Sequence, residues 1–209
     1  MLTINEYRKN PCRALSIPYW KAKVTTLPET MKILHDSEFD PACLSEYEDV
    51  PYFRLYHPLK NIKGITLKDV RIETAKHSDI PAIVDVINRS YTDLRVTGEQ
   101  ILGYTKTEVY REDLWILAVE EETDQILGCG LADFDREVQE GILEWIQVLP
   151  EHWGRKIGQA IVNELLDRMK ETAEFATVSG KVNDPASPEL LYRKCGFTGD
   201  DVWHILQRK

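Results

Sequence analysis

The segment Pro150–Leu166, PEHWGRKIGQAIVNELL, has the residue types of a phosphate-binding turn. It follows the apolar run Gly141–Pro150 and contains Gly154 and Gly158. A strand that leads through a short glycine-containing loop into a helix directs free backbone N–H groups and the positive end of the helix dipole toward one point. Glycine lacks a Cβ, so the backbone can approach a ligand closely there. The pattern predicts a site for phosphate groups, although a plain strand-to-helix turn has the same appearance.

A second pair of polar residues follows further along the chain. Asn183 ends the strand pattern FATVSGKVN, and the helix pattern SPELLYRKCGF then brings Tyr192 close to its end. Ser187 suits the N-cap of this helix, Pro188 suits its first turn, and Gly196 suits its termination. A lone Asn is also typical of an Asx turn and a lone Tyr of a hydrophobic core, so neither residue assigns a function by itself.

Hydrophobic period and turn residues predict the elements that position these residues. Helices are expected at 78–91, 106–112, 157–169 and 187–196. Strands are expected at 31–35, 52–57, 70–75, 114–121, 126–134, 141–150, 175–183 and 202–208. From residue 70 onward this order predicts an α/β fold, a mixed sheet with helices on both faces.

The first 66 residues differ in composition from the rest. Residues 1–66 hold six of the ten prolines and eight of the nineteen aromatic residues. Proline at this density discourages long helices, while the aromatic side chains need burial. We therefore expect two domains: 1–66, an irregular appendage with short strands packed on the main domain, and 67–209, the main domain.

From Val70 to Lys209, about two-thirds of the chain, the sequence resembles the GNAT superfamily of acetyl-CoA-dependent N-acetyltransferases. The family's loop pattern, R/Q-x-x-G-x-G/A, falls on the segment 153–158, WGRKIG. Its second pattern, an Asn followed by a helix that ends in Tyr-x-x-x-Gly-Phe, falls on Asn183 and on residues 192–197, YRKCGF. The resemblance implies a central, mostly antiparallel twisted sheet.

The resemblance also implies which residues bind acetyl-CoA as co-substrate. These residues are Ile146 and Val148 along the pantetheine arm, the loop residues Trp153, Gly154, Arg155, Lys156, Ile157 and Gly158 at the phosphates, and Asn183 at the arm from the neighbouring strand. Trp153 and Lys156 depart from the family pattern, which has Arg or Gln and Gly at these positions. The backbone N–H groups survive both changes, and lysine is an acceptable partner for phosphate, so we expect binding to persist. A shifted loop with weakened binding is the alternative.

Acetyl transfer to an amine requires two proton transfers. Alkyl amines with a pKa near ~10 are mostly protonated at neutral pH, so a base must take a proton from the acceptor. Glu144, in the strand ILEWIQV, shares a side with Ile146 and Val148 if the strand is regular, and is the candidate base; a substrate-binding or surface carboxylate is the alternative. Tyr192 stands where the family's usual acid tyrosine stands, and the resemblance implies that it protonates the departing thiolate.

In the family, the segment after the first helix often shapes the acceptor pocket, and here this is 89–109. Tyr91 and Tyr104 within it, and Tyr110 just beyond it, can hold a cation on their ring faces or pack in the core. Cys195 is expected to be buried rather than nucleophilic. His152 is expected to be exposed, and contact with phosphate or substrate is the alternative. No spacing of residues suggests a metal site.

The net charge of −9 argues against nucleic acid as a partner. Residues 1–66 carry nine basic and eight acidic side chains, whereas 67–209 carry 17 and 27. The acidic part, which includes residues 120–124, is expected to be a solvated hairpin or, alternatively, a surface that steers amines. This charge suits a small cationic amine acceptor.

No apolar run approaches the ~20 residues that span a bilayer, and the four cysteines lie far apart in the sequence, so we expect a cytoplasmic protein without a membrane partner. The sequence thus predicts an acyltransferase, an N-acetyltransferase that acts on a primary amine. A non-catalytic acyl-CoA-binding regulatory protein and a protein N-terminal acetyltransferase are the alternatives. A homodimer is left open.

Overall fold

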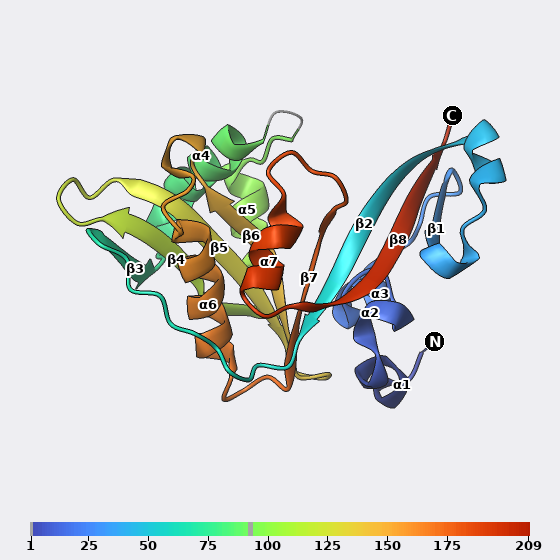
Figure 1. The fold of residues 1–209 in the computed structure, drawn as a ribbon, viewed down its shortest axis with the longest axis horizontal. Helices are drawn as coiled ribbons and strands as arrows, with labels where there is room; N and C mark the ends of the chain where they lie inside the picture. Colours follow the sequence, from blue (N-terminus) through green and yellow to red (C-terminus); the bar gives the residue numbers. More distant parts are fainter. Residues whose placement is uncertain (1, 92–93) are drawn as a thin grey trace. The chain divides into compact units, whose positions relative to one another are not determined.

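The protein is described by a computed structural model that covers residues 2–91 and 94–209. It divides into two compact units, which are described separately (Figure 1). Unit 1 comprises Met1–His57 and Thr177–Lys209, and unit 2 comprises Pro58–Ala176. This division differs from the predicted domains 1–66 and 67–209, because strands of the N-terminal segment pair with the C-terminal strand.

Unit 2 contains the strands in the order β6-β5-β4-β3, and each neighbouring pair is antiparallel. The strands are β3 (Val70–Thr74), β4 (Tyr110–Glu120), β5 (Ile126–Asp135) and β6 (Glu140–Val148). The helices are α4 (Ile80–Ser90), α5 (Gly98–Tyr104) and α6 (Ile157–Met169), with short 3-10 helices η3 (His77–Asp79) and η4 (Pro150–His152). The predicted strands and the long helix after the loop are confirmed with small changes at their ends.

A row of glycines on one face of the sheet allows α6 to pack closely on it. A Cβ added at Gly130 would lie 2.4 Å from Cγ2 of Ile161, and one at Gly128 would lie 3.3 Å from Cδ1 of the same residue. Gly141 lies equally close to Met169 at the other end of the helix. The helix stripe predicted from the sequence therefore faces residues that lack side chains.

The opposite face of these strands carries α4 and α5, so helices cover both faces of unit 2, as Figure 1 shows. Ile83 and Ile87 of α4 share a buried cluster with Leu117 of β4 and Leu131 of β5. Side chains of a strand alternate between its faces, which explains why Leu131 faces α4 while its neighbour Gly130 faces α6.

The helix predicted at 106–112 is wrong. Residues 106–109 form turns, and β4 already begins at Tyr110. The helix in this region is α5, which begins after the N-cap Thr97; the Thr97 hydroxyl accepts from the N–H of Gln100, and the Gln100 side chain accepts from the N–H of Thr97. This reciprocal capping stabilises a short helix that its apolar pattern alone does not reveal.

Unit 1 contains strands in the order β1-β8-β2-β7. The strands are β1 (Met31–His35), β2 (Tyr47–His57), β7 (Phe175–Lys181), which starts in unit 2, and β8 (Thr198–Arg208). The helices are α1 (Ile4–Lys9), α2 (Pro11–Ala14), α3 (Tyr19–Val24) and α7 (Pro188–Lys194), with 3-10 helices η1 (Asp36–Glu38) and η2 (Pro41–Ser45). Both β1 and β2 pair antiparallel with β8.

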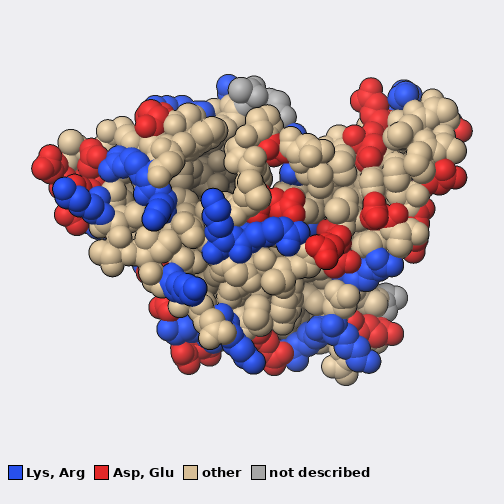
Figure 2. Space-filling model, in the orientation of Figure 1, with Lys and Arg blue, Asp and Glu red and all other residues tan. Residues whose placement is uncertain are grey.

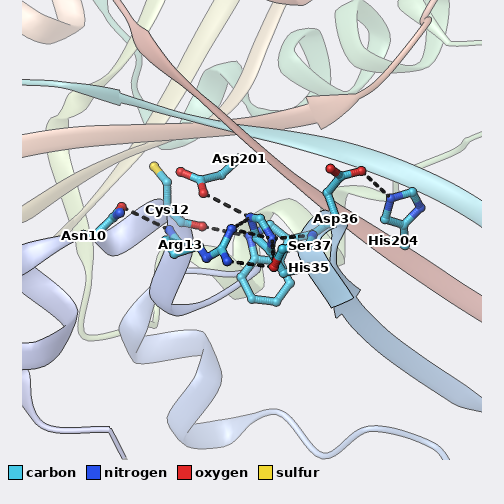
Figure 3. Close-up of polar contacts among 9 residues, drawn as sticks. Asn10, Cys12, Arg13, His35, Asp36, Ser37, Asp201 and His204 are labelled. Atoms are coloured by element: carbon cyan, nitrogen blue, oxygen red, sulfur yellow. Dashed lines mark hydrogen bonds and ion pairs between the residues drawn. The ribbon is translucent and has the colours of Figure 1, made fainter. Parts of the chain in front are cut away.

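A polar network binds the N-terminal segment to β8 (Figure 3). Nε2 of His35 lies 3.0 Å from the carboxylate of Asp201, and its Nδ1 accepts from the Ser37 N–H at 3.1 Å. Arg13 of α2 donates to the Ser37 hydroxyl at 2.7 Å, so α2, β1 and η1 meet at one point. Together with the strand pairing, this network makes the N-terminal segment part of unit 1.

Both units thus combine short helices with antiparallel strands, and the predicted α/β class with a mostly antiparallel sheet is confirmed. In the part of the chain that the structure describes, no helix is long and apolar enough to cross a membrane.

Candidate functional site

The loop between β6 and α6 turns with two residues in the left-handed region. Gly154 has φ 81° and Lys156, the N-cap of α6, has φ 63°. No side chain of the N-cap residue bonds to the first turn of α6, which is 13 residues long. The first N–H groups of a helix have no partner within it, so this turn presents backbone donors and the positive end of the helix dipole. A lysine rather than a glycine at Lys156 adds the strain of a Cβ in the left-handed region.

The two cations of the loop differ in their surroundings. The guanidinium of Arg155 lies 3.4 Å from the Glu120 carboxylate and 3.1 Å from Nδ1 of His152. Lys156 is exposed, and it forms no ion pair within residues 2–91 and 94–209. Since Glu120 partly neutralises Arg155, the lysine is the cation of the loop that an anion would meet first.

The acidic tip of the β4–β5 hairpin also contains basic side chains. Asp124 pairs with Arg71 at 2.8 Å, and Glu120 pairs with Arg155. Figure 2 shows acidic and basic side chains side by side at this left-hand end of unit 2. The solvated hairpin therefore fits better than a surface that attracts amines, because these carboxylates already have partners.

Trp153 is the third unusual residue of the loop. More than half of it, 56%, is exposed, and its indole Nε1 donates to the backbone carbonyl of Val148 at 2.9 Å. This contact folds the loop back onto the last residue of β6. The sequence placed Trp153 in the loop correctly but gave no sign of this bond.

A β-bulge interrupts β6 at Glu144. Trp145 pairs with Leu131 and Leu143 pairs with the next residue, Ala132, so Glu144 is an extra residue on its strand. The expectation that Glu144 shares a side with Ile146 and Val148 required a regular strand, and this condition is not met. Bulges re-aim side chains and are common beside active sites.

Beyond the bulge, the two faces of β6 are distinct. Ile146 and Val148 pair with Gly130 and Gly128 and therefore lie on the face that α6 covers. Residues 144–148 are all partly exposed, although the strand before them is buried. The strand end thus offers both backbone and side chains to a ligand.

The opposite face of this strand end holds a polar contact that the sequence did not reveal. The side-chain amide of Gln147 donates to the Tyr91 hydroxyl at 2.8 Å, and the Tyr91 ring meets Trp145 edge-on at 6.2 Å. Of the other predicted acceptor tyrosines, Tyr104 is 39% exposed and Tyr110 packs edge-on against a tryptophan. Thr92 and Asp93, within the predicted acceptor segment, lie outside the described residues.

Asn183 and Tyr192 belong to unit 1. Asn183 follows β7 in a left-handed conformation with φ 61° and is exposed. Tyr192 is 6% exposed and packs near Phe53 and Phe197, with ring centroids 6.2 Å and 5.8 Å away. The predicted Ser187 cap is wrong in detail, because Ser187 is left-handed at φ 49° and makes no side-chain bond to α7.

Two further candidates, Cys195 and His152, have surroundings that the sequence predicted only in part. Burial raises the pKa of the Cys195 thiol to about 12, so it is not a thiolate nucleophile at neutral pH. His152 is half-buried rather than exposed, and its Nδ1 lies beside Arg155. Among residues 2–91 and 94–209, no group of three or more His, Cys, Asp and Glu side chains could hold a metal ion.

The Acetyltransferase (GNAT) family model matches residues 80–197 of the chain. This range begins at α4 and includes β6, the loop, α6, Asn183 and α7. The chain therefore belongs to the GNAT acetyltransferase family, and the resemblance noted in the sequence is confirmed. No curated protein matches it in sequence.

Solved structures share the fold at low identity. A GCN5-related N-acetyltransferase from Sphaerobacter thermophilus has a TM-score of 0.71 at 16% identity; the match covers 90% of this chain and 63% of that one. A functionally unknown conserved protein from Staphylococcus epidermidis has a TM-score of 0.62 at 15% identity, with 100% and 82% coverage. The ribosomal-protein-S18-alanine N-acetyltransferase from Escherichia coli has a TM-score of 0.54 at 16% identity, with 66% and 93% coverage.

Proposed function

We propose that this protein is an N-acetyltransferase that transfers an acetyl group from acetyl-CoA to a primary amine of a small cationic acceptor. One observation carries the proposal. The family match includes a turn with left-handed Gly154 and Lys156 that opens a 13-residue helix without a side-chain cap. Such a helix start suits the phosphates of CoA.

The chain's own residues fit the parts of acetyl-CoA. In this proposal the backbone N–H groups from Arg155 to Gly158 bind the phosphates. Gly154 adds no side chain to the turn, and a Cβ added there would lie in open space with no atom within 4 Å. Lys156 adds a cation. The partly exposed strand end at Ile146 and Val148 offers backbone groups to an extended amide arm. Asn183 is the proposed contact of the same arm, as the family resemblance implies.

The reaction that this assignment implies is direct transfer. The acceptor must be neutral, so Glu144 takes its proton, and the amine nitrogen then bonds to the thioester carbonyl carbon as the carbon–sulfur bond breaks. Tyr192 gives its phenolic proton to the departing thiolate, and the proton that the acylated nitrogen loses returns to the phenolate. Acetyl-CoA supplies the activated thioester, and the protein supplies position and proton transfer.

The tyrosine beside the strand end, Tyr91, supports a cationic acceptor. Tyr91 is held by Gln147 with its ring next to Trp145, an aromatic surface that favours a cation. Acetylation of protein N-termini is the second candidate. The structural match to the ribosomal-protein-S18-alanine N-acetyltransferase from Escherichia coli, whose name gives a protein substrate, covers 93% of that enzyme.

The experiment has two parts. A thermal shift with millimolar acetyl-CoA tests binding, because a ligand stabilises the fold by RT ln(1 + [L]/Kd). Release of CoA thiol is then measured with polyamines, amino sugars and short peptides. Absence of a shift contradicts the proposal, binding without thiol release identifies an acyl-CoA-binding protein, and preference for peptides identifies the second candidate.

A matched pair of variants tests the role of Tyr192. Tyr192→Phe should bind acetyl-CoA yet lose about 10²-fold or more in turnover, the range typical of a general acid. Tyr47→Phe, which changes a tyrosine at the start of β2 whose ring lies beside Lys32, should leave turnover unchanged. Equal turnover of the two variants would contradict the role of Tyr192 as the acid.

A further inference from the structure

Trp153 covers part of the edge of β6 with its own side chain. Its indole N–H donates to the Val148 carbonyl at 2.9 Å, although 56% of the residue is exposed. A ring that is mostly exposed loses little buried apolar area when it moves. The contact is therefore one that a ligand can replace.

The Val148 carbonyl, which accepts from the Trp153 indole, points away from β5. The N–H of Leu149 donates to the Leu127 carbonyl at 2.9 Å, so the backbone of Leu149 faces β5. Backbone groups of successive residues in a strand point to opposite sides, so the Val148 carbonyl faces the other edge of β6. An extended chain that adds to a strand edge bonds to carbonyls of this kind.

We infer that Trp153 is a displaceable cap that competes with the pantetheine arm of the acyl-CoA for the Val148 carbonyl. This inference rests on the proposed function. A carbonyl oxygen has two lone pairs, but the two-ring indole that bonds to one of them also occupies space at the strand edge. Only protein molecules whose cap is open can pair with the arm. The apparent affinity is therefore the intrinsic affinity multiplied by the fraction of molecules whose cap is open.

The inference gives a role to the departure of Trp153 from the family's loop pattern. Arg or Gln at this position would bring a flexible polar side chain, whereas tryptophan brings a rigid ring with one donor. The cap leaves the backbone N–H groups around Gly154 and Lys156 free for phosphates. It therefore weakens binding of the arm without weakening binding of the nucleotide end.

The test compares Trp153→Phe with the unsubstituted protein by calorimetric titration. Phenylalanine keeps a ring but has no N–H donor, so the cap opens. The Kd for acetyl-CoA should fall about 2- to 10-fold, the effect of losing one competing hydrogen bond. The Kd for adenosine 3′,5′-bisphosphate, which has no pantetheine arm, should not change.

Trp203→Phe is the matched control. The Trp203 indole also donates to a backbone carbonyl, that of Cys12 at 2.8 Å, but in unit 1. This variant should leave both dissociation constants unchanged.

Three outcomes would overturn the inference. An unchanged acetyl-CoA Kd in Trp153→Phe shows that the indole does not compete with the arm. A higher Kd for both ligands shows that the ring contacts the nucleotide instead. Absence of acetyl-CoA binding by the natural protein overturns the proposed function as well, so the two failures are distinguishable.

Discussion

Gly130→Ala should destabilise unit 2 by forcing α6 away from the sheet. The added Cβ would lie 2.4 Å from Cγ2 of Ile161 and 3.0 Å from Cδ1 of Leu165. Carbon atoms pack best at about 3.5–4.0 Å, so the contacts must lengthen by about 1 Å. Ile161 is completely buried, and a β-branched side chain in a helix has one strongly preferred rotamer, so it cannot turn aside.

Overpacking of this kind costs about 1–3 kcal/mol. For a chain of this size, each kcal/mol lowers the Tm by about 2–4 °C, so the expected loss is about 2–12 °C by calorimetry or circular dichroism. Gly103→Ala is the matched control, because Gly103 lies in α5 with no atom within 4 Å of an added Cβ. Alanine should stabilise that helix by about 0.5–1 kcal/mol, so the two substitutions should have opposite signs.

A double-mutant cycle tests the cause of the loss. Ile161→Ala leaves a cavity on its own, but beside Gly130→Ala it makes room for the new methyl group. The double variant should therefore be more stable than the sum of the single effects predicts. Additive effects, or a Tm for Gly130→Ala equal to that of the natural protein, would refute the close approach of α6.

Two further predictions concern titratable groups. Burial lowers the pKa of His57 below its usual 6.5, and a backbone hydrogen bond with Cys195 only partly opposes this. The unfolded chain then binds more protons than the folded one, so the free energy of unfolding should fall as the pH drops below about 6.5. His57→Gln should reduce this dependence of the free energy of unfolding on pH, measured by urea titrations at several pH values. An identical pH dependence in the variant would contradict the assignment. Burial raises the pKa of the Cys129 and Cys195 thiols to about 12. The partly exposed Cys43 should therefore react first with a thiol reagent. Rapid labelling of Cys129 in the folded protein would contradict its burial.

The sequence predicts the repetitive parts of this fold well, because hydrophobic period is a local property. Strand β1 has the predicted bounds, and α6 covers the predicted stripe from Ile157 to Met169. The helix predicted at 106–112 failed because β4 extends to Tyr110, whose partner in the structure is Asp133 of β5. Pairing with a strand distant in sequence overrode the local pattern, while the capping signal at Thr97 and Gln100 was present in the sequence and was not used.

The candidate site was predictable only in its outline. The glycine-containing turn and the helix after it can be read from Gly154 and the apolar stripe. The bulge at Glu144 cannot, because an extra residue becomes visible only against the register of the partner strand. The contact between Trp153 and Val148 also depends on how a loop folds back in three dimensions.

The bulge has a structural consequence for the whole of β6. Gly141 faces Met169 of α6 before the bulge, and Ile146 lies on the same face after it. In a regular strand, positions 141 and 146 would lie on opposite faces, because side chains alternate. Without the extra residue Glu144, the alternation would turn Ile146 and Val148 to the α4 face. A single inserted residue thus keeps Ile146 and Val148 on the α6 face of β6, together with Gly141, while the Val148 carbonyl accepts from Trp153 on the side of β6 away from β5.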